Sequence, residues 1–431
     1  MADIKKILEQ AIGQLKAKGA DKGQVFVTES ETREFNAESG EFTLFRTLFD
    51  QDINIIAYKN QKKGSYYTNK LDEASVNSAV DMAMTSMESG EVDEAYDIAP
   101  DQGSIEAHKG VYEPDVDLLF TRTKELVDDI KTNHPKIVIQ QLVVNHSRRH
   151  MVFANTNGTF CDEYIGSYLV TIGIAGHEGD TTTSLVYTGV KLDNLDKPFM
   201  EVGDIKAKIK VAEEQIEMKP MEGKFTGTMV LTPGCLGSFM YYTAGLINGG
   251  VILDRTSIWL DKIGKQVADS RVSIKLDPHD DRIVCGETLT FDGFKAEAYD
   301  LIKEGKLQNF IINQYIAKKT GYAMSKNDGF DVIVESGEKS IEDIIRNIKQ
   351  GILVGEFSGG QPGTNGDFSG VAKNSYLIEN GKITGPVSEA MINGNIAAMF
   401  MNLVDISKES VCDGTSVLPY MAFDGIVVSG K

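Results

Sequence analysis

The chain has 431 residues, of which 41% are hydrophobic and 25% charged, as in folded globular proteins, and it is too long for one ordinary hydrophobic core. Its 63 acidic residues outnumber its 44 basic ones, which gives a formal net charge of -19 at pH 7. Because such a surface repels phosphate backbones and the basic runs are short, we expect no nucleic-acid partner.

The cysteines and the first residues indicate where the protein works. Four cysteines are scattered along the chain without a CxxC pair: Cys161, Cys235, Cys285 and Cys412. This pattern suits a reducing compartment and predicts neither a disulfide framework nor a zinc ribbon. Residues 1–18 are amphipathic with interleaved charges, unlike a signal peptide, and no run approaches the ~20 apolar residues of a membrane span. We therefore expect a cytoplasmic protein without membrane contact.

The first predicted unit, residues 1–110, is of the α+β kind. An N-terminal helix precedes four strand-like runs, and a second helix over 72–87 closes the unit. The runs are 24–28, 42–46, 52–58 and 64–68. The acidic stretch 91–114, poor in apolar residues and containing two prolines and two glycines, predicts a linker or a long surface connection.

The second predicted unit, residues 111–222, has the same order of a helix, several strands and a helix. The helices are expected over 115–132 and 202–217. The strands are expected at 136–144, 151–154, 159–175 and 182–190. His146 and His150 fall in a polar Ser-Arg-Arg segment between two of these strands, which predicts a hairpin turn with both imidazoles in solvent.

The third predicted domain, residues 223–431, is rich in glycine and strands. Strands are expected at 296–301, 308–312, 352–356, 375–379, 382–387 and 417–428, with a helix over 341–350. Asn380-Gly381 between two strands is a strong signal for a type I′ hairpin. The predicted fold class is therefore α+β, with two N-terminal α+β units that contain antiparallel sheets, followed by a β-rich C-terminal domain.

One helix of the third domain has an unusual composition. A short strand over 229–231 and a Pro233-Gly234 turn precede a helix without charges, expected from about Leu236 to Ile247. Thr232 is the predicted N-cap, and Gly249-Gly250 the predicted C-terminal stop. A helix without charges in an acidic chain should be buried. It also contains no histidine, so it offers no acid, base or metal ligand of the usual kind.

Common catalytic motifs fail on inspection of their spacing. His177-Glu178 begins an HExxH motif, but position 181 is Thr and the segment is typical of a hairpin, so we do not expect a metal site there. No GxSxG elbow occurs. The glycine-rich stretch 358–366 lacks the GK[ST] that holds phosphates.

Two features of the C-terminal domain each have two possible interpretations. The glycine-rich stretch is either a mobile loop or a backbone-lined rim for a peptide or partner, formed by Gly359, Gly360 and Gly363, because glycine permits close approach. Cys412 is either a buried small residue or a nucleophile, although no histidine lies beside it in the sequence.

From Leu260 onward, the chain resembles the TldD/PmbA (TldE) family, called modulators of DNA gyrase and understood as peptidases. The stretches that carry the resemblance, in family order, are Leu260-Asp-Lys-Ile-Gly-Lys-Gln266, Phe291-Asp-Gly-Phe294, Gly366-Asp-Phe-Ser369, Ile378-Glu-Asn-Gly-Lys-Ile383, Pro386-Val-Ser-Glu389, Ile392-Asn-Gly-Asn395, and Cys412 with Ser416-Val-Leu-Pro419.

The resemblance implies a branch of this family without its own zinc site. In the TldD branch, the helix after the Pro-Gly turn carries HExxxH and a C-terminal cysteine completes the zinc site. Anchored on the Pro-Gly turn and Gly237, those helix positions fall on Tyr241, Tyr242 and Leu246. Cys412 matches the remaining ligand, but one thiolate does not hold a zinc ion by itself. The chain therefore resembles the PmbA/TldE branch, and we expect no metal and no catalytic residue in it.

That branch implies a partner and a substrate class. Its members pair with a zinc-bearing TldD-like subunit to form a peptidase that degrades unfolded peptides and removes leader peptides. We thus expect zinc in the partner, an extended peptide as substrate, and a possible homodimer when the chain is alone. Two alternatives stay open: an independently active peptidase that uses Cys412 or an unrecognised site, and a regulatory binding protein that acts on gyrase or another target.

Overall fold

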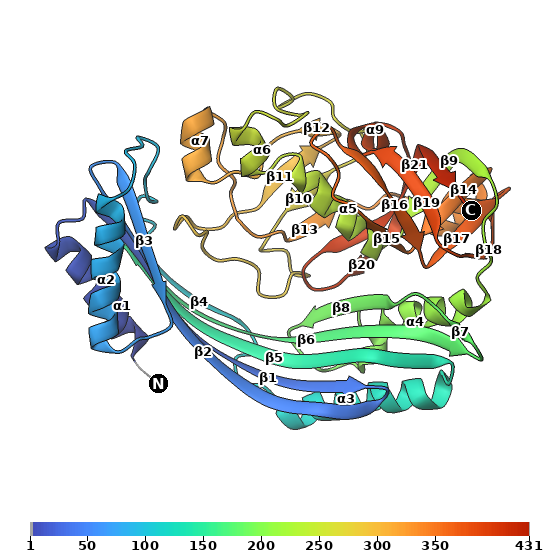
Figure 1. Ribbon diagram of the computed structural model, residues 1–431, viewed down its shortest axis with the longest axis horizontal. Coiled ribbons are helices and arrows are strands. Elements are labelled where there is room, and N and C mark those ends of the chain that lie inside the picture. The colour runs from blue at the N-terminus through green and yellow to red at the C-terminus, as the bar shows by residue number, and fades with distance from the viewer. Residues whose placement is uncertain (1–2, 431) are drawn as a thin grey trace.

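The computed structural model describes residues 3–430, so the outermost residues of the first and third predicted units, Met1, Ala2 and Lys431, lie outside the described part. Two β-sheets organise the chain (Figure 1). A long curved sheet from the N-terminal half runs beneath the C-terminal half in this view, with α1 and α2 covering one end of it and α3 and α4 the other. No helix of residues 3–430 is long and apolar enough to cross a membrane.

The N-terminal half supplies eight strands to the curved sheet. Its elements are α1 (Ile4–Ala17), β1 (Lys22–Glu38), β2 (Glu41–Lys59), β3 (Lys62–Thr68), α2 (Glu73–Glu88), β4 (Ser104–Gly110), α3 (Val116–Asn133), β5 (Ile137–Asn155), β6 (Phe160–Glu178), β7 (Thr181–Thr182), β8 (Val186–Leu192), η1 (Phe199–Glu201), α4 (Ile205–Glu214) and η2 (Gln215–Glu217). The strand order is β3-β2-β1-β5-β6-β4, with β7 and β8 also paired to β6.

Strands of both predicted N-terminal units share this sheet, because β1 pairs antiparallel with β2 on one side and with β5 on the other. The apolar faces of the helices form separate cores at its two ends. One core packs α1 and α2 against β1 and β2, and the other packs α3 and α4 against β5, β6 and β8. The predicted α+β class with antiparallel N-terminal strands is confirmed, while the boundary after residue 110 stays a prediction.

The prediction of a hairpin at His146 and His150 was wrong, because β5 runs unbroken through both residues. The polar segment between them is accommodated by charge pairing with the neighbouring strands. Arg148 pairs with Glu31 of β1 at 2.5 Å and Arg149 with Glu163 of β6 at 2.6 Å. Partners supplied by adjacent strands make a charged segment compatible with a central strand.

The two imidazoles are consequently structural rather than solvated. His146 is buried, bonds the Val111 carbonyl at 2.6 Å and lies against Tyr168. Burial lowers the pKa of His146 below its usual value. His150 pairs with Asp162 at 2.8 Å and stacks on Tyr164.

Other differences from the predictions have local causes. The predicted connection over 91–114 contains β4, an edge strand that pairs in parallel with β6, so only part of it is irregular. The predicted hairpin that contains His177 is confirmed, since β6 and β7 pair there. No strand forms over 308–312. The backbone N–H of Ile312 donates instead to the Ser325 hydroxyl at 2.7 Å, and that of Ile311 to the Ile247 carbonyl at 3.0 Å.

The C-terminal half forms a thirteen-stranded sheet. Its elements are β9 (Lys224–Leu231), α5 (Pro233–Gly245), α6 (Gly249–Leu253), β10 (Ile274–Leu276), β11 (Tyr299–Lys303), β12 (Lys306–Leu307), α7 (Gln314–Thr320), β13 (Val332–Val334), α8 (Ile341–Arg346), β14 (Gln350–Val354), β15 (Glu356–Gly359), β16 (Asp367–Lys373), β17 (Ser375–Glu379), β18 (Lys382–Val387), β19 (Ala390–Asn395), α9 (Ile396–Met401), β20 (Leu403–Cys412) and β21 (Val417–Ser429).

The main path of this sheet is β12-β11-β10-β13-β21-β9-β14-β17-β18. Strand β9 lies near its centre, parallel to β14 and antiparallel to β21. The predicted strands over 375–379 and 382–387 are confirmed. They join at Asn380-Gly381, whose φ values of 50° and 79° are both positive, as a type I′ turn requires.

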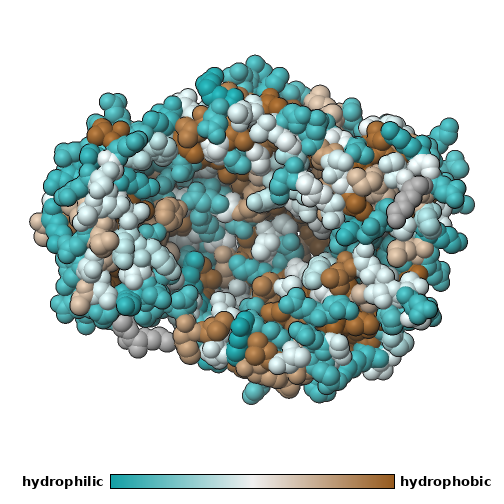
Figure 2. Space-filling view, in the orientation of Figure 1, coloured by the Kyte–Doolittle hydropathy of each residue, from teal (hydrophilic) through white to brown (hydrophobic). Residues whose placement is uncertain are grey.

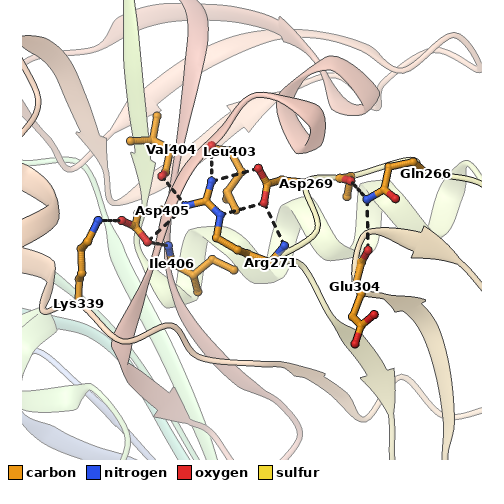
Figure 3. A network of polar contacts seen from close by, with 10 residues as sticks. Gln266, Asp269, Arg271, Glu304, Lys339, Leu403, Val404, Asp405 and Ile406 are labelled. Carbon is orange, nitrogen blue, oxygen red and sulfur yellow. Dashed lines mark hydrogen bonds and ion pairs between the residues drawn. The ribbon is translucent and has the colours of Figure 1, made fainter.

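An arginine ties the loop before β10 to the start of β20 (Figure 3). The Arg271 guanidinium bonds Asp269 at 2.9 Å and donates to the carbonyls of Leu403 at 3.0 Å and Val404 at 2.9 Å. Asp405, which follows them in β20, pairs with Lys339 at 2.5 Å. The two carbonyls lie where the β20–β21 register shifts, so the guanidinium satisfies acceptors at an irregular point of the sheet.

We predict that Arg271→Met lowers the Tm by about 1 °C, because losing the carbonyl bonds at this partly exposed site costs roughly 1 kcal/mol. Arg282→Met is the matched control. Its side chain is 49% exposed against 48% for Arg271 and pairs with Asp280 in the same way, but it makes no carbonyl bond within residues 3–430. Thermal denaturation checks the difference, and equal shifts for both variants would contradict the role given to the carbonyl bonds.

Candidate functional site

Helix α5 is held where the central strand β9 ends. Thr232 caps the helix as predicted, because its hydroxyl accepts from the Cys235 N–H at 3.4 Å and also donates to the Gly355 carbonyl at 3.2 Å. The second bond joins the cap to the junction between β14 and β15. The helix ends at Gly245, and Gly249-Gly250 begin α6 behind the N-cap Asn248, so the predicted stop at the glycines was wrong.

The prediction that α5 is buried holds for only one of its faces. Leu236, Phe239 and Met240 are buried, and Phe239 packs edge-on against Phe368 with ring centroids 5.2 Å apart. The opposite face consists of small or amphipathic residues, so it meets solvent without a charge. Gly234, Ser238 and Tyr241 lie on this exposed face.

The positions that the sequence resemblance aligns with the HExxxH motif lie at the C-terminal end of α5. Tyr241 is 63% exposed, whereas Leu246 is 3% exposed and belongs to the main core. Tyr242 lies between them in exposure and packs against Phe239 and Phe357. Burial raises the pKa of the Tyr242 phenol, which keeps it protonated. A neutral phenol and an alkyl chain do not fit zinc, which takes imidazole, thiolate or carboxylate ligands.

Cys412 lies at the end of β20, apart from these residues. Its thiol donates to the Arg282 carbonyl at 3.3 Å and packs near Ile283, Ile333 and Val417. It lines a cavity of about 390 Å³ that includes no residue of α5 and no histidine. Within residues 3–430, no group of three or more His, Cys, Asp or Glu side chains is placed to hold a metal ion.

The thiol of Cys412 is not in an activating environment. Burial raises its pKa above the usual value, with the carboxylate of Asp413 acting in the same direction. A nucleophilic cysteine requires a lowered pKa, normally from a nearby imidazolium, a helix N-terminus or a metal.

The glycine-rich stretch follows β15 on the surface. Gly359 ends β15 opposite Gly370, and a Cβ there would lie 2.7 Å from both the Phe357 ring and the Ser369 carbonyl oxygen. Gly360 and Gly363 are exposed, and the Gly363 N–H donates to the Asp367 carbonyl at 3.2 Å. The predicted role of these glycines as a peptide-lining rim stays a prediction.

A second cavity, of about 380 Å³, opens between the curved sheet and the C-terminal half. The surface in this view is also hollowed where the two halves face each other (Figure 2). Residues of β8 and α4 line the cavity from one half, and residues of α5, β15 and the β20–β21 turn line it from the other. The polar and small residues that line it include Thr188, Asp204, Lys208, Gly234, Ser238, Glu356, Asp413 and Ser416.

Lys208 and Glu356 form the charged centre of this cavity. The Lys208 ammonium lies 4.0 Å from a carboxylate oxygen of Glu356, which also accepts the Tyr187 N–H at 3.2 Å. Burial raises the pKa of Glu356, and the positive charge of Lys208 opposes that rise.

No sequence motif predicts this pair. One available signal is that Lys208 interrupts the apolar face of α4 formed by Ile205, Ile209 and Ala212. Glu356 gives no comparable signal at the start of its short strand.

Comparisons with known proteins agree on one family. The model of the PmbA/TldA metallopeptidase C-terminal domain matches residues 223–430, and that of PmbA/TldA metallopeptidase domain 1 matches residues 23–95. The metalloprotease PmbA of Escherichia coli O157:H7 is 24% identical over 450 residues, covering 98% of this chain and 97% of that protein. The PmbA homolog of Haemophilus influenzae is 22% identical over 440 residues, covering 97% of this chain and 96% of that protein.

The crystal structure of TldE from Thermococcus kodakarensis has the same fold. It superposes with a TM-score of 0.87 at 20% identity and covers 98% of this chain and 100% of that one.

We predict that Leu246→His lowers the free energy of unfolding by about 2–4 kcal/mol, because it places a polar ring in the core. Tyr241→His, one turn earlier at an exposed position, should cost less than about 0.5 kcal/mol. Chemical denaturation of both variants measures the difference. Equal stability of the two variants would contradict the prediction, because it would mean that histidine is tolerated as well at the buried position 246 as at the exposed position 241.

We also predict slow alkylation of Cys412 at neutral pH. Because its pKa is raised, the rate should stay below that of a free model thiol at pH 7 and continue to rise above pH 9. Peptide-level mass spectrometry after iodoacetamide treatment separates Cys412 from Cys235, whose pKa burial raises to about 12. Rapid modification of Cys412 with a midpoint below pH 8 would instead indicate an activated nucleophile.

Proposed function

The chain belongs to the PmbA/TldD metallopeptidase family, and from this membership we propose that it is the non-catalytic, TldE-type subunit of a two-subunit zinc metallopeptidase. One observation carries the proposal. When the chain is aligned with the HExxxH motif as the family resemblance implies, Tyr241, Tyr242 and Leu246 stand at the positions of the two ligands and the base. Zinc chemistry requires a partner that supplies those residues.

The packing of α5 supports a structural role for this chain and a catalytic role for its partner. Leu246 and Tyr242 are part of the apolar packing of the C-terminal half, so the helix has become a structural element at these positions. When bound in a TldD-like partner, zinc would supply an activated water and polarise the scissile carbonyl. The residues of this chain would orient the substrate and exclude water.

The proposed substrate is an extended peptide, as in an unfolded protein or a leader segment. Extended peptides are held through main-chain hydrogen bonds to a strand edge or an exposed backbone, which requires few specific side chains. The exposed glycines at 359, 360 and 363 leave backbone groups accessible beside β15, whose first residue, Glu356, lines the cavity between the two halves. This proximity supports a peptide path along that side of the C-terminal half.

The proposed partner is a TldD-like zinc peptidase subunit, and in its absence a homodimer. A TldD homolog from Haemophilus influenzae is 27% identical over 199 residues, covering 43% of this chain and 41% of that protein. Two related chains in one family are consistent with an assembly in which homologous subunits have diverged in chemistry.

An independent cysteine peptidase is less well supported. Each of the six histidines has a structural partner: His108 with Glu106, His134 with Glu213, His146 with Val111, His150 with Asp162, His177 with Thr182, and His279 with Ala296. The raised pKa of the Cys412 thiol also argues against a nucleophilic cysteine.

The hypothesis of a regulatory protein rests on the description given to a structurally similar protein. A solved structure from Bacteroides thetaiotaomicron, described as a candidate modulator of DNA gyrase, superposes with a TM-score of 0.88 at 20% identity and covers all of both chains. That similarity shows the fold only. Co-purification with a gyrase subunit rather than with a TldD-like protein would favour this hypothesis.

We predict that the purified chain alone does not cleave unfolded casein with or without added zinc, and that cleavage appears when the TldD-like subunit of the same organism is added. A partner variant whose HExxxH glutamate is replaced by Gln should abolish the activity of the pair. Casein hydrolysis and zinc content of each purified chain are the measurements. Robust zinc-dependent cleavage by this chain alone would overturn the proposal.

A further inference from the structure

One border of the curved sheet is a long strand segment that is paired on one side only. Strand β2 pairs with β1 along its length, but β3 covers its other side only from Ile53 to Lys59. Residues 41–52 therefore have an unpaired side within residues 3–430, about 40 Å long at the usual rise of a strand. The other strands at borders of this sheet, β3, β4 and β8, have seven residues each.

The side chains of this segment lie in solvent on both faces of the sheet. Every residue from 45 to 51 is exposed. Phe45 is 56% exposed, Leu48 45% and Phe49 69%. Phe45 also extends an aromatic cluster with Phe42 and Phe120, with ring centroids 5.6 and 5.8 Å away. A gathering of large apolar side chains at the surface marks an interaction site more often than isolated ones do.

The segment lacks the usual protection of an edge strand. Edge strands are normally short, or carry lysine, proline or a bulge that prevents pairing with another chain. Residues 43–52 contain no lysine, proline or glycine. The register of β1 and β2 shifts between Asn36 and Ala37, near the turn that joins the strands, and not beside residues 45–51. The backbone of this border is therefore open to another strand.

The turn at the other end of β2 shows which backbone groups point outward. The two-residue turn Asn60-Gln61, with φ values of 52° and 61°, is closed by Lys59 and Lys62. In such a hairpin the closing residues exchange both hydrogen bonds, so the odd-numbered residues of β2 direct their backbone groups toward β3. The pairing with β1 runs from residue 59 back to residue 44 without a shift. Residues 45, 47, 49 and 51 consequently direct their N–H and C=O groups to the unpaired side.

We propose that a second copy of this chain pairs with residues 43–51 of β2 in antiparallel orientation, about a two-fold axis at Thr47, so that two curved sheets become one. Antiparallel pairing of a strand with its own copy is the isologous contact that a two-fold axis produces. This register places Phe45 of each copy opposite Phe49 of the other, and cross-strand aromatic pairs stabilise antiparallel sheets.

The charges of the segment select this register. Arg46 and Asp50 lie on the face opposite to the phenylalanines, and Arg46 pairs there with Glu34 at 2.9 Å. With the axis at Thr47, Arg46 of one copy lies diagonal to Asp50 of the other, within reach of a long side chain. An axis one residue earlier would place the two Arg46 side chains opposite each other, which is destabilising. An axis one residue later would bring residue 43 against the position that β3 occupies beside Ile53.

The mass of the full chain in solution is the first test. Light scattering and sedimentation equilibrium should give twice the 47.2 kDa of one chain and a reversible decrease on dilution. A mass of one chain at all concentrations up to about 100 μM would overturn the proposal.

Variants connect the dimer to the border strand. Phe49→Asp should weaken self-association at least tenfold, because it replaces an aromatic pair by a charge at both symmetry-related positions. Ile383→Asp is the matched control, since Ile383 is 46% exposed on β18, a border strand of the other sheet. A dimer that is unaffected by Phe49→Asp, or weakened equally by both variants, would contradict the proposed surface.

A second pair of variants tests the backbone rather than the side chains. Thr47→Pro removes the N–H that the two copies would share at the axis, whereas Thr47→Val keeps it. Proline is tolerated on an edge strand where its nitrogen faces solvent, so the fold of the monomer should persist with an unchanged circular dichroism spectrum. We expect Thr47→Pro to be monomeric and Thr47→Val to remain dimeric. A dimeric and folded Thr47→Pro would exclude pairing through this strand.

Hydrogen exchange locates the contact in the unmodified chain. Amides of residues 43–51 should exchange more slowly at concentrations where the dimer forms than at concentrations where it dissociates. Protection that depends on concentration in another segment, with none in 43–51, would assign the dimer to a different surface.

This inference specifies the surface of the homodimer named above and does not rest on the proposed peptidase role. All of these measurements use the chain without its partner, so absence of cleavage by the pair would leave the surface standing. A monomeric chain would overturn this surface and the homodimer, but not the zinc-bearing partner.

Discussion

The position of α5 depends on the burial of β9. The last residues of this strand are wholly buried between β14 and β21, so its end point in the sheet is determined by pairing on both sides. Thr232 then links the first turn of the helix to the β14–β15 junction. These contacts position the first turn of the helix, and its two ends lie in different surroundings. One end borders a cavity, and the other contains Tyr242 and Leu246, which pack in the apolar core of the C-terminal half.

The curved sheet positions the other wall of that cavity. Strand β8 and helix α4 contact the C-terminal half through specific polar bonds. The Lys191 N–H donates to the Asp413 carbonyl at 2.8 Å, the Gln215 amide donates to the Ser375 carbonyl at 3.1 Å, and the Tyr376 hydroxyl bonds Glu214 at 2.7 Å. These contacts hold Lys208 opposite the N-terminus of α5, although the two come from different sheets. The shape of the cavity therefore depends on the interface between the N-terminal and C-terminal halves.

The non-catalytic role that we propose for this chain is compatible with the fold that it shares with its relatives. The apolar packing of the C-terminal half uses the inner face of α5, which needs leucine and phenylalanine rather than ligands. The outer face is free to change as long as it avoids buried charge. A family with this architecture can keep the helix as a structural element in one chain and as a metal site in another. The chemistry of a site is thus separable from the fold that carries it.

The sequence alone determined features whose physical cause lies within a few residues. The Thr232 cap, the Asn380-Gly381 hairpin and the absence of His, Asp and Glu from α5 depend on neighbouring residues, on backbone φ, or on residue type. Tertiary structure alone decided the course of β5, because Arg148 and Arg149 find their carboxylates on other strands. It also decided the meeting of Lys208 with Glu356 and α5. Such contacts join segments far apart in the chain, and local patterns carry no information about them.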